Sequence, residues 1–274
     1  MKVLIADRLS DKTVADLKKL GAEVVVNTAL TEDNLGEALG DVEVLIVRSK
    51  KVKAPAIAAA PQLSLIIRAG AGVNTIDLAA ASSRGIHVAN CPGKNTDAVA
   101  ELAIGLLIAA DRRIVAATND LSAGKWRKKE YGKATGLKGR TLGILGLGGI
   151  GKAVARRAQG LEMKVVAWSR SLTEEAAEEL GVGFCASPEA LARQSDAVSV
   201  HLALKPETKH IINKAFLDQM KNGAILINAS RGEVVDTTAL KEAIRAKKLR
   251  VGLDVFENEP TGGEDTFADT ELAA

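Results

Sequence analysis

The chain has 274 residues, with 37 basic against 34 acidic side chains and a net charge of +3 at pH 7. This length exceeds the usual domain of about 100 to 200 residues, so we expect two domains. The near-even charge does not indicate nucleic acid or another polyanion as a partner. Scarce aromatic residues beside abundant Ala, Val, Leu and Ile favour an α/β fold over a β-sandwich.

The first half alternates strand-like apolar runs with helical patterns. Its expected strands span residues 2–6, 23–27, 44–48, 63–67 and 86–90. Between the first two, Ser10 can cap a helix that Gly21 ends. Val14, Leu17 and Leu20 share the apolar face of this helix. The pattern is a βαβ unit, the building block of parallel sheets.

A long helical pattern from Thr96 to about Asp120 contains no Pro and only one Gly. We expect one long helix there and place the domain boundary at its start, which gives domains 1–95 and 96–274. The basic stretch 124–140 interleaves Trp126 and Tyr131 with Lys and Arg, a composition that resembles a nucleic-acid patch. Because the run is short and the chain is nearly neutral, we interpret it as a solvated interdomain loop.

A second series of strands is expected at residues 141–145, 164–168, 196–201, 224–229 and 250–255. The longest apolar run, residues 102–110, falls short of the ~20 residues that span a bilayer, and no signal-peptide core is present. Cys91 and Cys185 lack metal or disulfide spacing. We therefore expect a reduced, cytoplasmic protein without a metal or a membrane partner.

The stretch GLGGIGKA, residues 146–153, fits two phosphate-binding motifs. Gly146, Gly148 and Gly151 fit the dinucleotide fingerprint G-x-G-x-x-G, and the same stretch fits all but the last position of a Walker A loop. That last position needs Ser or Thr for magnesium, but Ala153 stands there. Since a strand pattern precedes the loop and a helical pattern follows it, we interpret it as a dinucleotide site with the pyrophosphate at the helix N-terminus.

The strand after the fingerprint ends in Trp168, Ser169 and Arg170 instead of the Asp or Glu that holds the ribose hydroxyls of NAD. A missing carboxylate removes repulsion toward a 2′-phosphate, and Arg170 can pair with one. The cofactor is thus NAD or NADP, and we hypothesise that NADP is accepted.

Two later segments carry candidate catalytic residues. ILINASRGEVVD runs from a strand into a turn with Arg231, and RVGLDVFENEP brings Asp254 and Glu259 to the same sheet edge. Ligands of open parallel sheets bind beyond the carboxyl ends of the strands. A guanidinium there can clamp a carboxylate and polarise the adjacent carbonyl of a 2-keto acid.

These motifs resemble those of the D-isomer-specific 2-hydroxyacid dehydrogenases. In the first half, IVRSK, IIRAGAGVNTID and NCPGKNTDAVAELAIGLL resemble the D-3-phosphoglycerate dehydrogenases of that family. The resemblance covers nearly the whole chain. It implies a flavodoxin-like substrate domain, an NAD(P)-binding Rossmann domain, a homodimer built around the long helix, and reversible hydride transfer to a small-molecule 2-keto acid. The best-matching substrate pair is 3-phosphoglycerate and 3-phosphohydroxypyruvate, of serine biosynthesis.

By the same resemblance, Arg231 binds the substrate carboxylate and carbonyl, and Glu259 hydrogen-bonds a catalytic histidine and raises its pKa. Asp254 would orient the nicotinamide amide. The other implied cofactor-binding residues are Gly146, Gly148, Gly149, Ile150, Gly151, Ser169, Arg170, Leu202, Ala229 and Ser230. The implied substrate-binding residues are Arg48, Lys50, Gly70, Ala71, Gly72 and Val73.

One departure concerns the catalytic histidine, which in the family follows the GLDVFENEP segment. Here the residues after Pro260 include no histidine before Ala274. His87 and His210 do not match its position, and we expect His201 to contact cofactor or pack locally. The resemblance therefore suggests a truncated member, incomplete at the C-terminus of its dinucleotide domain and impaired in hydride transfer.

Two alternatives stay open. A glyoxylate or hydroxypyruvate reductase would share Arg231 and Glu259 and differ in lacking a substrate phosphate. A dinucleotide-binding regulatory module, like corepressor members of the family, would keep the cofactor loop without turnover.

Overall fold

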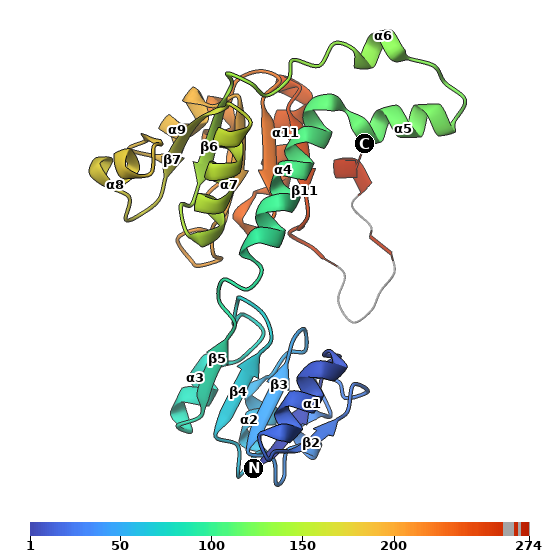
Figure 1. Cartoon of the computed structure of the whole chain (residues 1–274), viewed down its shortest axis with the longest axis vertical. Helices are drawn as coiled ribbons and strands as arrows, with labels where there is room; N and C mark the ends of the chain where they lie inside the picture. The colour runs from blue at the N-terminus through green and yellow to red at the C-terminus, as the bar shows by residue number, and fades with distance from the viewer. Residues whose placement is uncertain (260–265, 268–269, 274) are drawn as a thin grey trace. The chain divides into compact units, whose positions relative to one another are not determined.

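The computed structural model describes residues 1–259, 266–267 and 270–273. The chain folds as two compact units, Met1–Asn95 and Thr96–Ala274. Each unit is a parallel sheet with helices on its faces (Figure 1). This confirms the expected α/β class.

The first unit is a five-stranded parallel sheet in the order β2-β1-β3-β4-β5. Its strands are β1 (Lys2–Ile5), β2 (Glu23–Val26), β3 (Val44–Val47), β4 (Leu65–Arg68) and β5 (His87–Asn90). Its helices are α1 (Asp11–Lys19), η1 (Leu35–Ala38), α2 (Ala54–Ala58) and α3 (Leu78–Ser83). This is the flavodoxin-like strand order, and its switch point lies between β1 and β3, where the chain winds in opposite directions.

Successive apolar side chains along each strand point to opposite faces of this sheet, so a core forms on each face. Val3 and Ile5 of β1 belong to the cluster beneath α1, whereas Leu4 belongs to the cluster that packs around η1 and α2. β3 alternates in the same way. Because both faces are covered, the strands are continuous apolar runs, which is why the sequence pattern found them.

The second unit is a six-stranded parallel sheet in the order β11-β10-β9-β6-β7-β8, the doubly wound Rossmann arrangement. Its strands are β6 (Thr141–Leu145), β7 (Lys164–Trp168), β8 (Gly183–Phe184), β9 (Ala197–Val200), β10 (Ile225–Asn228) and β11 (Arg250–Leu253). Its helices are α4 (Thr96–Arg112), α5 (Ile114–Ser122), α6 (Lys128–Tyr131), α7 (Gly149–Gly160), α8 (Glu174–Glu179), α9 (Pro188–Gln194), α10 (Lys214–Gln219), η2 (Gly232–Val234), α11 (Thr237–Lys247) and η3 (Thr270–Ala273).

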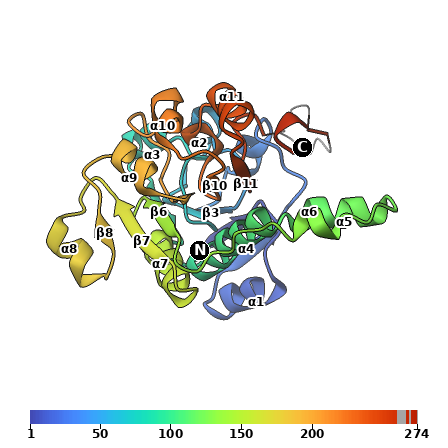
Figure 2. The ribbon, with the colours of Figure 1, turned by 90° about the horizontal axis from the view of Figure 1, so that it is seen from above.

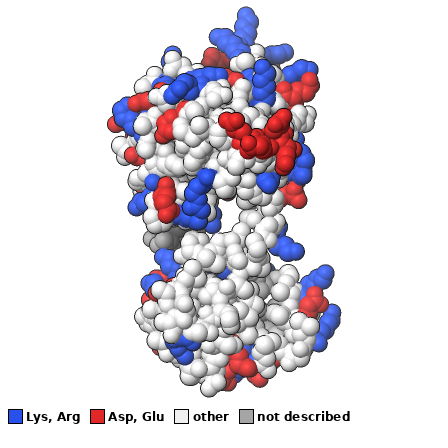
Figure 3. Space-filling view, turned by 90° about the vertical axis from the view of Figure 1, so that its left-hand side faces the viewer, with Lys and Arg blue, Asp and Glu red and all other residues white. Residues whose placement is uncertain are grey.

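In the second unit, α4 and α7 cover one face of the sheet, and α9, α10 and α11 cover the other (Figure 2). On the face drawn in Figure 3, basic side chains are dispersed among acidic ones. No helix in the described part of the chain is both long and apolar enough to cross a membrane.

The expected single helix from Thr96 to Asp120 is wrong, because Arg113 adopts the left-handed conformation (φ 52°, ψ 43°) and separates α4 from α5. The sequence offers no Gly or Pro at this break. Side-chain contacts with α6 hold the conformation: the Arg113 guanidinium lies 3.0 Å from a Glu130 carboxylate oxygen and stacks on the Tyr131 ring. The basic stretch 124–140 that contributes these contacts lies inside the second unit, so its interpretation as an interdomain loop is also wrong.

A buried carboxylate fixes the last turn of α4. Asp111 is 1% exposed, accepts hydrogen bonds from the Arg140 guanidinium at 2.8 Å and from the Gly136 amide at 3.0 Å, and lies 3.9 Å from the Arg250 guanidinium. These contacts tie α4 to the start of β6 and to β11 at the edge opposite the carboxyl ends of the strands.

We predict that Asp111→Ala lowers the free energy of unfolding by about 3 to 5 kcal/mol, because it removes the only carboxylate that the largely buried Arg140 guanidinium contacts among the described residues and leaves the Gly136 amide without its acceptor. Asp97→Ala, which removes a 72% exposed partner of Arg157, is the control and should cost much less. Urea unfolding followed by tryptophan fluorescence reports on the second unit, since both tryptophans lie in it. Equal midpoints for the two variants would contradict the prediction.

Candidate functional site

The fingerprint loop joins β6 to α7 at the carboxyl edge of the second sheet. Gly146 has φ +99°, and a Cβ there would press on the backbone carbonyl of His201. A Cβ at Gly151 would overlap the Gly146 carbonyl, whereas one at Gly148 would meet nothing. Gly146 and Gly151 therefore serve the turn and helix packing, and Gly148 leaves open space at the N-terminus of α7 where a phosphate can approach.

The N-terminus of α4 lies beside that of α7. A Cβ at Gly149 would stand 3.7 Å from the Thr96 hydroxyl, and Arg157 of α7 forms an ion pair with Asp97 of α4 at 2.9 Å. Two helix N-termini thus meet at the fingerprint loop, and both favour negative charge. Sequence reasoning missed Thr96 because it placed this residue only at a domain boundary.

The end of β7 supports the fingerprint loop. The Gly146 amide donates to the Trp168 carbonyl at 2.8 Å. Ser169 follows, half-buried, and Arg170 is exposed with no ion pair among the described residues. The position that carries an acidic residue in the NAD fingerprint therefore presents a hydroxyl and a free guanidinium.

His201 follows β9 directly beneath the fingerprint loop. Its Nε2 lies 2.8 Å from the Ser199 hydroxyl, and its buried Nδ1 has no hydrogen-bond partner in the described part of the chain. Burial lowers the pKa of His201 to about 4. The imidazole is therefore neutral at pH 7, and a neutral ring makes a weak proton donor. Next to it, the Leu202 side chain lines the same turn at Gly146.

The turn after β10 is shaped by a buried amide. Asn228 is 1% exposed, its Nδ2 donates to the Arg231 carbonyl at 2.9 Å, and its Oδ1 accepts from both the amide and the hydroxyl of Ser230. The turn of Ala229, Ser230 and Arg231 is thereby locked in place. The Arg231 guanidinium itself donates to the Ser230 carbonyl at 2.6 Å.

The segment after β11 packs on this turn. A Cβ at Gly232 would overlap the Phe256 carbonyl, so only glycine lets the two backbones lie this close. The Phe256 amide donates to a Glu259 carboxylate oxygen at 2.9 Å. Arg231 and Glu259 are therefore carried on touching segments, and Asp254 is exposed at the start of the second one. Pro260 lies outside the described residues.

A histidine–carboxylate pair ties the same region together. The His210 Nε2 lies 2.5 Å from a Glu257 carboxylate oxygen, and the His210 amide donates to the Glu233 carbonyl at 2.9 Å. Partial burial raises the pKa of Glu257, but hydrogen bonds from His210 and Thr237 outweigh it, so the pKa lies below its ordinary value. The sequence did not indicate this pair.

In the first unit, the predicted substrate residues follow β3 and β4. A carboxylate oxygen of Asp7, after β1, accepts the amides of Arg48, Ser49 and Lys50 at 2.7, 3.1 and 3.2 Å. The Lys50 ammonium donates to the Thr28 carbonyl at 3.2 Å. Asp7 thus fixes the turn that presents Arg48, a role the sequence did not reveal.

The loop from Gly70 to Val73 has its carbonyls occupied, and the Gly70 amide donates to the Arg68 carbonyl at 2.8 Å. Asn90 donates to the Ala71 carbonyl at 2.6 Å, and Arg68 donates to the Gly72 carbonyl at 3.0 Å. Among the described residues, the amides of residues 71–73 have no acceptor. Such a row of free amides suits a carboxylate.

The predicted residues thus form two groups. One group lies at the carboxyl edge of the second sheet, after β6, β7, β9, β10 and β11. The other lies at the carboxyl edge of the first sheet, after β3 and β4. No group of three His, Cys, Asp or Glu side chains within the described ranges is arranged to hold a metal ion.

Comparisons with known proteins identify the family of this chain. Residues 104–273 match the family model described as "D-isomer specific 2-hydroxyacid dehydrogenase, NAD binding domain". A D-3-phosphoglycerate dehydrogenase of Archaeoglobus fulgidus is 42% identical over 262 residues, which cover 95% of this chain and 49% of that protein. A glyoxylate reductase of Thermococcus litoralis is 44% identical over 239 residues, which cover 84% of this chain and 72% of that protein.

A solved structure of a D-lactate dehydrogenase from Aquifex aeolicus, complexed with NAD and lactic acid, superposes with a TM-score of 0.85 at 27% identity. The match covers 100% of this chain and 84% of that one. The chain spans about half the length of the D-3-phosphoglycerate dehydrogenases it matches. It belongs to the D-isomer specific 2-hydroxyacid dehydrogenase family.

Proposed function

We propose that this protein is an NAD(P)-dependent oxidoreductase that interconverts a D-2-hydroxy acid and its 2-keto acid, with 3-phosphoglycerate and 3-phosphohydroxypyruvate as the preferred pair. The observation that carries the proposal is the carboxyl edge of the second sheet. There the fingerprint loop, the Arg231 turn and the Glu259 segment lie together. The 42% identical relative supports the phosphorylated substrate.

The nicotinamide, when bound, supplies or accepts the hydride at C2 of the substrate. The chain's own residues fit such a cofactor, since open space at Gly148 and the N-terminus of α7 receive a pyrophosphate. Arg231 binds the substrate carboxylate and polarises the C2 carbonyl. Asp254 accepts a hydrogen bond from the nicotinamide amide.

The proton that accompanies the hydride requires a positioned acid. His201 is neutral and held by Ser199, and His210 is paired with Glu257, so neither stands free for this task. We propose that Glu259 serves to orient a proton donor. Without such a donor, turnover is about 10² to 10⁴ slower than with a positioned donor.

The two units have different tasks in this reaction, and the second accepts NAD or NADP. The first unit binds substrate through Arg48, Lys50 and the loop of residues 70–73, and the second binds the dinucleotide. Ser169 and Arg170 accommodate the 2′-phosphate of NADP, because no carboxylate repels it and a free guanidinium can pair with it. Cys91 and Cys185 are both unpaired, which fits a reducing, cytoplasmic setting. The proposed substrate pair assigns the reaction to serine biosynthesis.

A reductase acting on glyoxylate or hydroxypyruvate is the second candidate, because a glyoxylate reductase is 44% identical. The two candidates differ in the phosphate of the substrate and share every residue assigned above in the second unit.

We also propose a homodimer formed through α5 and α6. α5 has no buried residue, and Ile114, Val115, Leu121 and Trp126 are 47%, 64%, 61% and 78% exposed. Leu121 and Trp126 line a hollow of about 340 Å³ with Ala117 and Tyr131. An apolar helix that covers no core of its own chain suits the same helix of a second copy. Figure 1 shows α5 and α6 extending from the end of α4 away from the six-stranded sheet.

We predict keto-acid-dependent oxidation of NADH or NADPH by the purified chain, fastest with 3-phosphohydroxypyruvate and slower with hydroxypyruvate and glyoxylate. Arg231→Gln should lower kcat/KM about 100-fold through loss of a charge-assisted bidentate contact, and Arg231→Lys should lower it less. Arg170→Ala is the control outside the reacting region, and it should weaken only the affinity for NADPH. Cofactor binding without turnover of any of these acids would favour the regulatory alternative.

Three glycine variants separate cofactor binding from folding. Gly148→Ala should raise the Kd for NADH at least about tenfold and leave the thermal midpoint unchanged, because its Cβ occupies only the space left for phosphate. Gly151→Ala should destabilise the second unit, because its Cβ overlaps backbone. Gly160→Ala, later in α7 and in open space, is the control. Unchanged NADH affinity in Gly148→Ala would place the dinucleotide elsewhere.

Trp126→Asp should convert the proposed dimer to a monomer in sedimentation velocity, because a charge replaces the most exposed apolar side chain of the α5–α6 surface. Leu20→Asp changes an equally exposed residue of the first unit, and this variant should still sediment as a dimer. A wild-type monomer at the same concentration refutes this part of the proposal.

A further inference from the structure

A hollow of about 480 Å³ opens at the carboxyl edge of the five-stranded sheet. Its walls come from the ends of three neighbouring strands: Arg8, Leu9 and Ser10 after β1, Arg48 after β3, and Ala69 after β4. β1 and β3 flank the switch point of this sheet, which is where open parallel sheets bind their ligands.

The hollow carries two positive charges that the protein does not neutralise. Arg8 and Arg48 are both exposed, and across the described residues neither guanidinium has a hydrogen-bond or ion-pair partner. The nearest carboxylate of the turn, Asp7, is occupied by three backbone amides. Ser10 caps α1, so the positive end of a nine-residue helix also faces this region.

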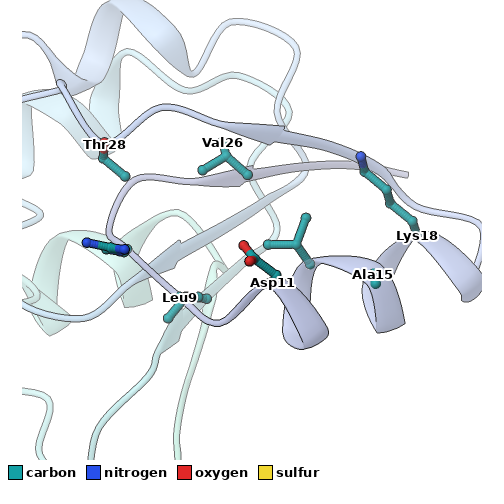
Figure 4. A pocket seen from close by; sticks show the side chains of 8 residues that line it. Leu9, Asp11, Ala15, Lys18, Val26 and Thr28 are labelled. Carbon is teal, nitrogen blue, oxygen red and sulfur yellow. The ribbon is translucent and has the colours of Figure 1, made fainter.

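A second hollow of about 470 Å³ shares Arg8 and Leu9 and continues between α1 and β2. Figure 4 shows Asp11 and Lys18 projecting from α1 toward it, with Val26 and Thr28 on the opposite wall. Arg8 therefore stands between the two hollows, whereas Lys18 lines only the second.

The clamp by Asp7 makes the arrangement rigid. Its carboxylate holds the turn after β3 to the segment after β1. The backbone positions of Arg8 and Arg48 are therefore fixed relative to each other at this edge. Lys50 belongs to the same turn, but its ammonium is engaged by the Thr28 carbonyl. Arg8 is thus better placed than Lys50 to offer a free cation to a ligand.

We infer that Arg8 is a specificity-determining residue that, with Arg48, binds the phosphate of a phosphorylated 2-hydroxy acid. This inference rests on the proposed function. Paired guanidinium groups match the geometry and charge of a phosphate dianion. The free amides of residues 71–73, after β4 on the same edge, are further donors for the substrate carboxylate in addition to Arg231. A substrate without phosphate gains nothing from Arg8.

The test measures binding and needs no turnover. Calorimetry follows 3-phosphoglycerate and D-glycerate binding to the full chain saturated with NADH, a combination in which both partners are already reduced. Arg8→Gln should weaken the affinity for 3-phosphoglycerate about ten- to a hundredfold, which is the usual effect of losing one charge-assisted contact. It should leave the affinity for D-glycerate unchanged. Lys18→Gln, the matched control, should change neither.

An unchanged affinity for 3-phosphoglycerate in Arg8→Gln, or an equal loss for both ligands, overturns the inference. Equal binding of both ligands by the wild type also overturns it, and leaves the oxidoreductase proposal intact. If the wild type binds NADH but neither acid, the inference and the proposed substrate class fail together. The NADH affinity of each variant confirms that it is folded.

Discussion

The candidate site depends on a strand that becomes a helix within three residues, at the edge where six parallel strands end. Gly146 must take a positive φ and lie against the His201 carbonyl, and Gly151 must lie against the Gly146 carbonyl. Only this close packing brings the N-terminus of α7 level with the carboxyl ends of β6 and β9. The partial positive charge of the helix then stands where a pyrophosphate can reach it.

The remaining site residues are positioned by polar side chains that stand at strand ends and hold the loops that follow. Asn228 ends β10 and bonds the turn carrying Arg231, and Asp7 follows β1 and bonds the turn carrying Arg48. The two units use the same device at the same edge of their sheets. Loops held this way keep their shape without ligand, which reduces the entropy that binding must overcome.

Much of this fold was predictable from the sequence because it depends on local patterns. Buried parallel strands are continuous apolar runs, and all ten predicted strands are present, with ends that differ by at most two residues. β8 was missed because two residues leave no pattern to detect. The break at Arg113 was missed because its cause lies in Glu130 and Tyr131, on another helix, and not in Arg113 itself.

The candidate site was predictable only where chemistry follows a motif. The fingerprint glycines, Arg231 and Glu259 lie on segments whose order marks them. The Asp7 clamp joins residues 41 to 43 positions apart, and the His210–Glu257 pair joins residues 47 positions apart. Arg8 follows a strand with no motif around it, and only the folded edge shows that it shares a hollow with Arg48. Such contacts depend on tertiary structure and leave no periodic signal.

The sharpest test of the proposed dinucleotide site is a map of backbone amide chemical shifts during titration of the isotopically labelled chain with NAD⁺. We expect saturable changes centred on the fingerprint loop and the turns after β7, β9 and β10, all at one edge of the second sheet. Changes centred on the opposite edge, around Asp111 and Arg140, or no saturable change at all, would contradict the assignment of this edge to the cofactor.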